Sequence, residues 1–159
     1  MSKYDWLLFL HVTGAFLLLG ASVIAATLLF AAVRRERPSE VALFLGLIRF
    51  AVPAVGAGSL LTLVFGLWLV SAAGYDYSYG SFWVIAALVL WVLANALGKF
   101  GGDRAEATRK LAVELAGRGD APTPELTTRL RDPRMLALNY GSGLLVLLIL
   151  VDMIWKPGA

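Results

Sequence analysis

Four long apolar runs dominate this chain, and nearly all of its positive charge lies on one side of them. The runs are Trp6–Val33, Phe50–Ala73, Phe82–Gly98 and Leu136–Trp155. A helix needs ~20 apolar residues to cross the hydrocarbon core of a bilayer, with a usual range of about 17–25. Unpaired backbone amides cannot face lipid, so each run predicts a transmembrane helix. The sequence therefore predicts an all-α fold, a four-helix transmembrane bundle.

The positions of Lys and Arg predict how this bundle is oriented. Of the 14 Lys and Arg residues, four lie between the first and second runs and eight lie between the third and fourth. Loops that stay in the cytoplasm collect these residues. We therefore expect an N-out, C-out, multi-pass protein of the inner (cytoplasmic) membrane, with the loop Tyr75–Tyr79 outside. The net charge of +3 then predicts contact with lipid headgroups and no nucleic-acid partner.

Length and composition limit the remaining possibilities. With 159 residues, the chain predicts a single domain, residues 1–159. It contains no cysteine, which excludes disulfides, iron–sulfur clusters, thiol catalysis and cysteine-based zinc sites. Along Asp103–Ala116 the apolar residues Ala105, Leu111, Ala112 and Leu115 lie among charged residues, which predicts that the third helix continues into the cytoplasm as a helical extension.

Polar residues beside prolines predict where helices begin. Ser39 follows Pro38 and is expected to be the N-cap of the second helix, which would then start near Glu40. Thr123 precedes Pro124, and the pair predicts a short helix with Thr123 as its cap. Asp132 and Pro133 repeat this arrangement before the fourth apolar run.

Small residues spaced about one helical turn apart predict the faces on which the helices pack. Helices in lipid associate where small side chains let their backbones approach closely. The first helix has such a face, on which His11 and Gly14 lie. The second helix has a ladder formed by Ala54, Gly58, Thr62 and Gly66. The last helix has a seam formed by Asn139, Gly143, Val146, Leu150 and Met153.

His11 is the most informative polar residue within the apolar runs. It lies five residues after Trp6, which places it ~8 Å along the helix in the outer leaflet. A neutral imidazole can ligate haem iron or another metal, or relay protons. Alternatively, His11 is a structural, hydrogen-bonded residue. A single histidine cannot supply both axial ligands of a haem, so the second would be Met153, Lys156, water, or His11 of a second copy of the chain.

The other polar residues in the spans predict structural contacts. Asp152 and Lys156 are four residues apart and are expected to form an ion pair along the last helix. Asn95 and Asn139 are expected to form hydrogen bonds between helices. Aromatic residues at the outer boundary predict an interfacial belt. They are Tyr4, Trp6, Tyr75, Tyr77, Tyr79, Trp83 and Trp155.

Several of these motifs together resemble a family of proteins. The segment Leu8–Ala15, the residues Pro53 and Gly66-Leu67-Trp68, and the closing Trp155–Gly158 resemble an uncharacterised bacterial family of predicted four-helix integral membrane proteins. That family looks distantly similar to the copper-resistance protein D-like domain and to the haem-binding HemJ family of protoporphyrinogen oxidases.

The resemblance to the HemJ family implies a role for one residue only. Its histidine in a first-helix Leu-His-x-x-Gly motif is a haem ligand, and the matching residue here is His11. This chain lacks the lysine that those oxidases carry at the start of the third helix, and it has no tryptophan before Gly20. The resemblance therefore implies haem binding without oxidase activity.

Three functions follow from these features. The first is a membrane protein that binds haem b, or a related porphyrin, through His11 and Met153. The second is a non-catalytic scaffold or partner subunit with a structural His11, acting in the bilayer as a homo-oligomer or beside another membrane protein. The third is a carrier of a metal or small solute. The residues present favour a non-enzymatic role.

Overall fold

The protein is all-helical, and four of its helices are long and apolar enough to cross a membrane. The computed structural model describes residues 2–72 and 78–158. The helices are α1 (Lys3–Val33), α2 (Pro38–Ala72), α3 (Phe82–Gly117), α4 (Pro124–Leu130) and α5 (Pro133–Trp155). This confirms the predicted four-helix transmembrane fold. The expected loop aromatics Tyr75 and Tyr77 lie outside the described residues.

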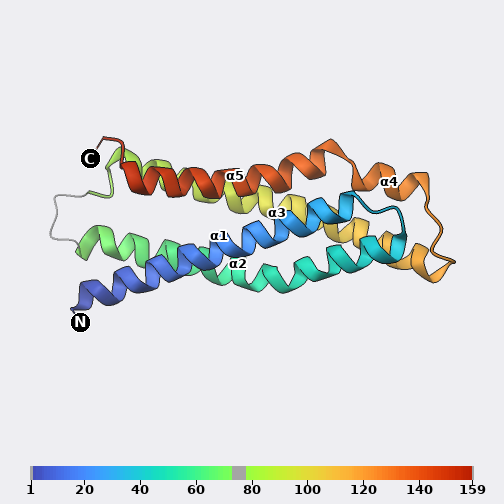
Figure 1. Cartoon of the computed structure of the whole chain (residues 1–159). Helices are drawn as coiled ribbons and strands as arrows, with labels where there is room; N and C mark the ends of the chain where they lie inside the picture. The colour runs from blue at the N-terminus through green and yellow to red at the C-terminus, as the bar shows by residue number, and fades with distance from the viewer. Residues whose placement is uncertain (1, 73–77, 159) are drawn as a thin grey trace.

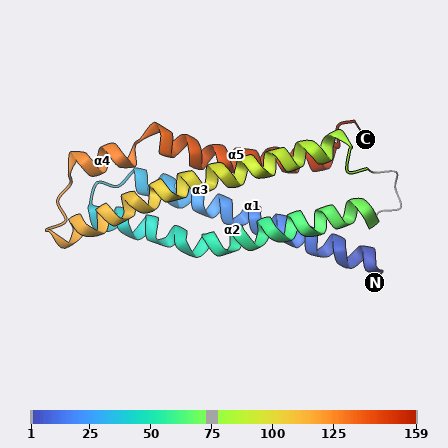
Figure 2. The same cartoon turned by 180° about the vertical axis from the view of Figure 1, so that it is seen from behind.

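The spanning helices form two closely packed pairs, α1 with α2 and α3 with α5. The two pairs run side by side along the bundle (Figures 1 and 2). Both termini are at one end, and α4 is at the opposite end together with the turn between α1 and α2 (Figure 1). The end with α4 carries the basic loops, so we refer to it as the inner end and to the other as the outer end. The assignment of inner and outer sides remains a prediction from the charge distribution.

Glycines bring α1 and α2 into backbone contact. A Cβ atom added at Gly58 would lie 2.5 Å from the Leu18 amide nitrogen and 2.8 Å from the Gly14 carbonyl oxygen. On the facing helix, a Cβ atom at Gly14 would lie 2.7 Å from the Thr62 amide nitrogen. Real Cβ atoms do not approach backbone this closely, so both positions require glycine. The predicted packing faces of the first two spanning helices are confirmed.

The pair α3–α5 packs through a set of residues that differs in part from the predicted seam. Gly98 and Gly101 of α3 face Ser142 and Asn139 of α5, and the Ser142 hydroxyl donates to the Ala94 carbonyl over 2.9 Å. The prediction was wrong for two members of the seam. A Cβ atom built on Gly143 would meet no neighbouring helix of the described structure within 4 Å, and Leu150 is 40% exposed. At these two positions the contact lies one residue earlier, at Ser142 and Ile149, while Asn139 and the buried Val146 remain in it.

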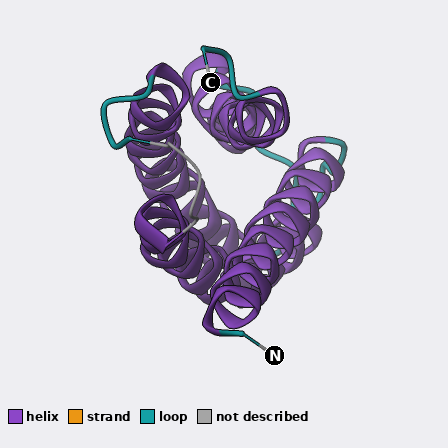
Figure 3. Ribbon diagram, turned by 90° about the vertical axis from the view of Figure 1, so that its left-hand side faces the viewer, coloured by secondary structure: helices purple, strands orange, loops and turns teal. Residues whose placement is uncertain are grey.

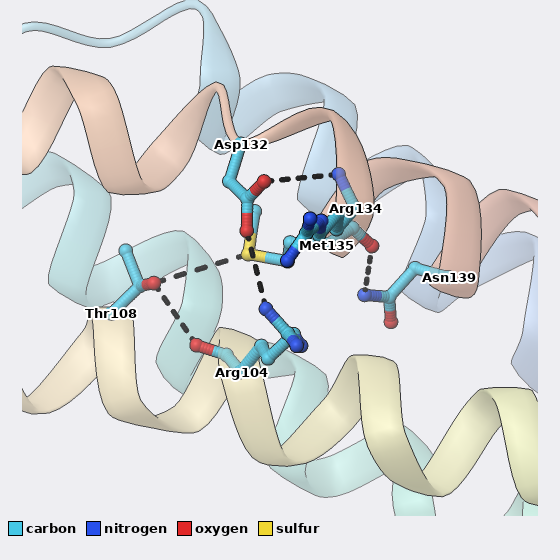
Figure 4. Close-up of polar contacts among 6 residues, drawn as sticks. All are labelled: Arg104, Thr108, Asp132, Arg134, Met135 and Asn139. Atoms are coloured by element: carbon cyan, nitrogen blue, oxygen red, sulfur yellow. Dashed lines mark hydrogen bonds and ion pairs between the residues drawn. The ribbon is translucent and has the colours of Figure 1, made fainter.

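The two asparagines differ in their hydrogen bonds. Asn95 of α3 accepts a hydrogen bond of 3.2 Å from the Ser59 hydroxyl of α2, which confirms a contact between helices. Asn139 instead donates to the Met135 carbonyl of its own helix over 2.8 Å (Figure 4). Asn139 lies directly against Gly101, so close backbone packing replaces the hydrogen bond predicted between helices.

The inner end holds the most completely buried apolar cluster, and all five helices contribute to it. At ~1.5 Å per residue, α3 is ~54 Å long and extends well beyond a hydrocarbon core of ~30 Å. This confirms the predicted inner extension of the third helix. The cluster consists of Leu29, Ala32, Val41, Leu45, Ala105, Ala112, Leu126, Leu130 and Met135.

Polar contacts fix the start of α5 on the extension of α3 (Figure 4). The Asp132 carboxylate accepts a hydrogen bond from the Arg134 amide over 3.0 Å and lies 3.4 Å from the Arg104 guanidinium. The Thr108 hydroxyl lies 3.9 Å from the Met135 sulfur. Asp132 is therefore the cap of α5, as predicted, and Thr123 likewise caps α4 through the Leu126 amide.

The start of α2 differs from the prediction. The helix begins at Pro38, so Ser39 is its second residue and not its N-cap. The Asp120 carboxylate, from the turn after α3, accepts hydrogen bonds from the Ser39 amide over 2.7 Å and from the Ser39 hydroxyl over 2.6 Å. These bonds hold the pKa of Asp120 below its usual range, because they favour the ionised carboxylate. A residue 81 positions away thus performs the capping.

Candidate functional site

A cavity of about 240 Å³ lies at the outer end of the bundle. Figure 3 views the bundle along its axis from this end, where the pairs α1–α2 and α3–α5 diverge. All four spanning helices line the cavity, and most of the lining side chains are aliphatic. A mostly apolar pocket with a few converging polar groups is the usual form of a ligand site. The lining residues that carry nitrogen, oxygen or sulfur side-chain atoms are Tyr4, His11, Thr62, Trp83, Trp91, Met153 and Lys156.

His11 is held on the cavity wall by a hydrogen bond to the neighbouring helix. Its Nδ1 atom lies 2.9 Å from the Thr62 carbonyl oxygen of α2. A carbonyl oxygen only accepts, so Nδ1 must carry the proton in this bond. The neutral ring then has its lone pair on Nε2. Histidines that ligate metals commonly use one nitrogen for the metal and donate the other N–H to a carbonyl or carboxylate group.

Gly66 provides the space that the imidazole of His11 occupies. A Cβ atom at Gly66 would lie 2.9 Å from Cε1 and 3.0 Å from Nδ1 of His11. The ring therefore packs directly on the backbone of α2, one turn after Thr62. The packing ladder of the second helix and the candidate site are thus one continuous surface.

The structure brings the predicted site residues His11 and Met153 to the same cavity, from α1 and α5 respectively. Lys156, which the sequence analysis considered as another second ligand, lines it too. Lys156 has a left-handed backbone (φ 41°), and its amide donates to the Asp152 carbonyl over 2.8 Å. The predicted ligand His11 and two of its suggested partner ligands, Met153 and Lys156, therefore line one cavity.

The expected ion pair between Asp152 and Lys156 gives way to another arrangement. The Lys156 ammonium nitrogen lies 5.5 Å from the ring centroid of Trp83, within the range of a cation–π contact. Asp152 is buried and does not line the cavity, and its Oδ2 atom has no hydrogen-bond partner among the described residues. Helical spacing alone predicted the pair, but the left-handed residue at the end of α5 redirects the lysine.

Two cavity residues were not identified as site candidates from the sequence. The hydroxyl of Thr62 and the indole N–H of Trp91 are buried and have no hydrogen-bond partner within residues 2–72 and 78–158. An unsatisfied buried polar group costs about 1–3 kcal/mol, so both groups are suited to contact a ligand. Trp91 could have been recognised, because it lies in the middle of an apolar run and interfacial tryptophans lie at the ends.

The side chains around the cavity do not resemble a site for a bare metal ion. The described part of the chain holds no group of three or more His, Cys, Asp or Glu residues that could enclose one. A porphyrin differs in this respect, because its ring nitrogens already hold the iron and the protein supplies only axial ligands. One imidazole and one thioether on this apolar cavity match that requirement in ligand type, whereas the cavity volume of about 240 Å³ is below the roughly 300–1,000 Å³ usual for ligand pockets.

Comparisons with known proteins agree with the architecture. The family model described as "Predicted integral membrane protein (DUF2269)" matches residues 5–157. No curated protein and no solved structure matches the chain. The comparisons therefore contain no match to the copper-resistance protein D-like domain or to the HemJ family, whose expected similarity rests on the short motifs alone.

Proposed function

The chain belongs to this family of predicted integral membrane proteins, and we propose that it binds haem b, or a related porphyrin, in the outer-end cavity through His11. The observation that supports this most strongly is the hydrogen bond from His11 Nδ1 to the Thr62 carbonyl. It fixes the tautomer and leaves Nε2 as the basic nitrogen, on the wall of an apolar cavity. Iron is ligated by neutral imidazole in this form.

The other cavity residues have matching roles in this proposal. Met153 supplies a thioether on the opposite helix pair, and a His–Met pair of axial ligands is known for haem iron. The rings of Trp83 and Trp91 provide flat apolar surface for a macrocycle. A bound haem would supply one-electron redox chemistry. The protein would hold the haem, exclude water and set the ligands of the iron.

An alternative function is that of a non-catalytic scaffold or partner subunit with a structural His11. The same hydrogen bond favours it, because the bond joins α1 to α2 beside Gly66. Hydrogen bonds between transmembrane helices contribute about 0.6 kcal/mol on average and up to ~1.7 kcal/mol. A structural His11 should therefore be replaceable by any side chain that keeps the donor.

The two functions can be separated by comparing His11→Asn with His11→Ala. Asparagine places an amide N–H where the imidazole has Nδ1–H, so it can keep the bond to Thr62 but cannot ligate iron. Protein purified from haem-supplemented cells should show a Soret absorption band in the wild type. This band should be lost in both variants, while thermal stability should fall only in His11→Ala.

Met153→Ala tests the second ligand with the same preparation. If Met153 ligates the iron, this variant should convert a low-spin spectrum to a high-spin one. If His11 of a second copy of the chain is the ligand instead, the low-spin spectrum should depend on the oligomeric state. Wild-type protein without a chromophore after haem supplementation would refute the proposal and favour the scaffold.

A further inference from the structure

The turn between α1 and α2, at the inner end of the bundle (Figure 1), holds two arginines that form no ion pair among the described residues. They are Arg34, which caps the end of α1, and Arg35. The five ion pairs of the described residues all join side chains of α3, α4, α5 or the segments that connect them. The positive charge of the two arginines is therefore left for an anion from outside the protein.

Aromatic rings hold both guanidinium groups in place. The guanidinium carbon (Cζ) of Arg34 lies over the ring of Phe30, one helical turn earlier in α1, at 4.1 Å from its centroid. The Cζ atom of Arg35 lies 5.2 Å from the ring centroid of Phe44 in α2. A guanidinium group that stacks on a ring can still donate from its N–H edge, and this planar edge matches two oxygens of a phosphate. The two side chains are therefore suited to bind a phosphate group.

The depth of Phe30 places these contacts at the level of the lipid headgroups. Counted from Trp6 at the outer boundary, ~20 residues of α1 cross a hydrocarbon core of ~30 Å and end near Ala26. Phe30 then lies ~6 Å beyond the core, in a headgroup layer that is about 5–8 Å thick. Phe30 is 49% exposed, so the Arg34 guanidinium on its ring lies beside the phosphates of the inner leaflet.

An exposed face of α1 leads from this position towards the middle of the bilayer. Residues that are four, three and four positions apart share one face of a helix, and here they are Val23, Thr27, Phe30 and Arg34. The first three are exposed. The Thr27 hydroxyl donates to the Val23 carbonyl over 2.8 Å, so it needs no hydrogen bond from water. This face can therefore lie against the acyl chain of a lipid whose headgroup is at Arg34.

We propose that an anionic phospholipid binds here, with its phosphate on Arg34 and Arg35 and an acyl chain along the exposed face of α1. Two cations favour a lipid of net negative charge, because they repel the amine of a zwitterionic headgroup. The glutamates of the same turn, Glu36 and Glu40, take part in none of the five ion pairs. The site lies at the opposite end from the cavity and does not depend on the proposed haem function.

The test compares the binding of dioleoyl phosphatidylglycerol and dioleoyl phosphatidylcholine, which share their acyl chains and phosphate but differ in net charge. Delipidated protein in dodecyl maltoside is titrated with each lipid, and bound lipid is counted by native mass spectrometry. One arginine beside an anionic headgroup contributes about fivefold in affinity. Wild-type protein should therefore bind phosphatidylglycerol about tenfold or more tightly. Arg34→Gln should reduce this preference about fivefold.

Phe30→Leu tests the ring beneath the guanidinium without changing the charge. It should also reduce the preference for phosphatidylglycerol, because the Arg34 side chain loses the surface that holds it at headgroup level. Both variants change exposed side chains, so both should keep the helical circular dichroism of the wild type.

Lys110→Gln is the matched control variant. It removes the same charge from an exposed residue of α3 that belongs to none of the five ion pairs. This substitution should leave the lipid preference unchanged. A loss equal to that in Arg34→Gln would assign the effect to net charge and overturn the proposal. Equal binding of the two lipids by the wild type would also overturn it.

Inorganic phosphate separates a lipid site from a site for a free anion. Millimolar phosphate should not displace phosphatidylglycerol, because it lacks the acyl chain that contacts α1. Complete displacement would show that the arginines bind any phosphate, and it would overturn the assignment to a lipid.

Discussion

Replacing Gly58 by alanine should force α1 and α2 apart. The added Cβ atom would lie 2.5 Å from the Leu18 amide nitrogen and 2.8 Å from the Gly14 carbonyl oxygen. Non-bonded heavy atoms reach their optimum at ~3.5–4.0 Å, so the helices must separate by roughly 1 Å. Both neighbouring atoms are backbone, and no side chain can rotate away to relieve the clash.

Gly56→Ala provides the reference for the size of this effect. Both substitutions gain the same helix propensity, about 1 kcal/mol in favour of alanine. A Cβ atom at Gly56 would meet no other helix among residues 2–72 and 78–158 within 4 Å, so this variant lacks the clash. The difference in free energy of unfolding between Gly58→Ala and Gly56→Ala therefore isolates the overpacking, for which we expect about 1–3 kcal/mol.

The measurement is unfolding in one detergent, followed by helical circular dichroism. Gly58→Ala should unfold well before Gly56→Ala, and the wild type should be less stable than Gly56→Ala by about 1 kcal/mol, the gain in helix propensity. Gly14→Ala, whose Cβ would meet the Thr62 amide nitrogen at 2.7 Å, should resemble Gly58→Ala. The double variant should cost less than the sum, because the first substitution already separates the helices. Equal stability of Gly56→Ala and Gly58→Ala would refute the close packing described here.

Two further predictions concern the ends of the bundle. The pKa of Asp120 is held below its usual range by Ser39, so this bond contributes stability above about pH 4 that is lost as the pH falls through the lowered pKa. In Asp120→Asn the free energy of unfolding should fall less steeply below about pH 4 than in the wild type. An unchanged dependence on pH in this range would contradict the capping role. A cysteine placed at Ser78 should react with an impermeant maleimide added to intact cells. A cysteine placed at Gly117 should react only after the cells are lysed. Labelling of both in intact cells would contradict the orientation.

Features set by local sequence were predictable. The apolar runs predicted the spanning helices, and the pairs Thr123-Pro124 and Asp132-Pro133 predicted two helix starts that the structure confirms. In each helix start the capping side chain and the backbone amide that it binds lie within a few residues of each other. The arrangement of the other helices therefore does not affect the prediction.

Features set by the relation between helices were not predictable in the same way. The start of α2 at Pro38 depends on Asp120, which a scan for local caps cannot detect. The seam of α5 was predicted to include Gly143, but at this position the contact is made by Ser142, one residue earlier. Small residues occur on both sides of that boundary, so the spacing alone does not distinguish the two faces.

The candidate site was predicted in part. The need for a second axial ligand paired His11 with Met153, and the structure brings both residues to one cavity. Whether they bind a cofactor remains a prediction. The hydrogen bond between His11 and Thr62 depends on which helix faces which, and so does the indole N–H of Trp91, which has no partner among the described residues. A single sequence does not show which helices face each other.

The pairing of the helices also bears on how the protein is made. Each tight pair, α1 with α2 and α3 with α5, is formed by segments that are neighbours in sequence, separated at most by the short helix α4. Contacts between near neighbours form early, and a growing chain completes them in order of synthesis. The two hairpins can therefore assemble in the bilayer one after the other and dock afterwards. The cavity spans both hairpins, so its wall is complete only after the last helix has been inserted.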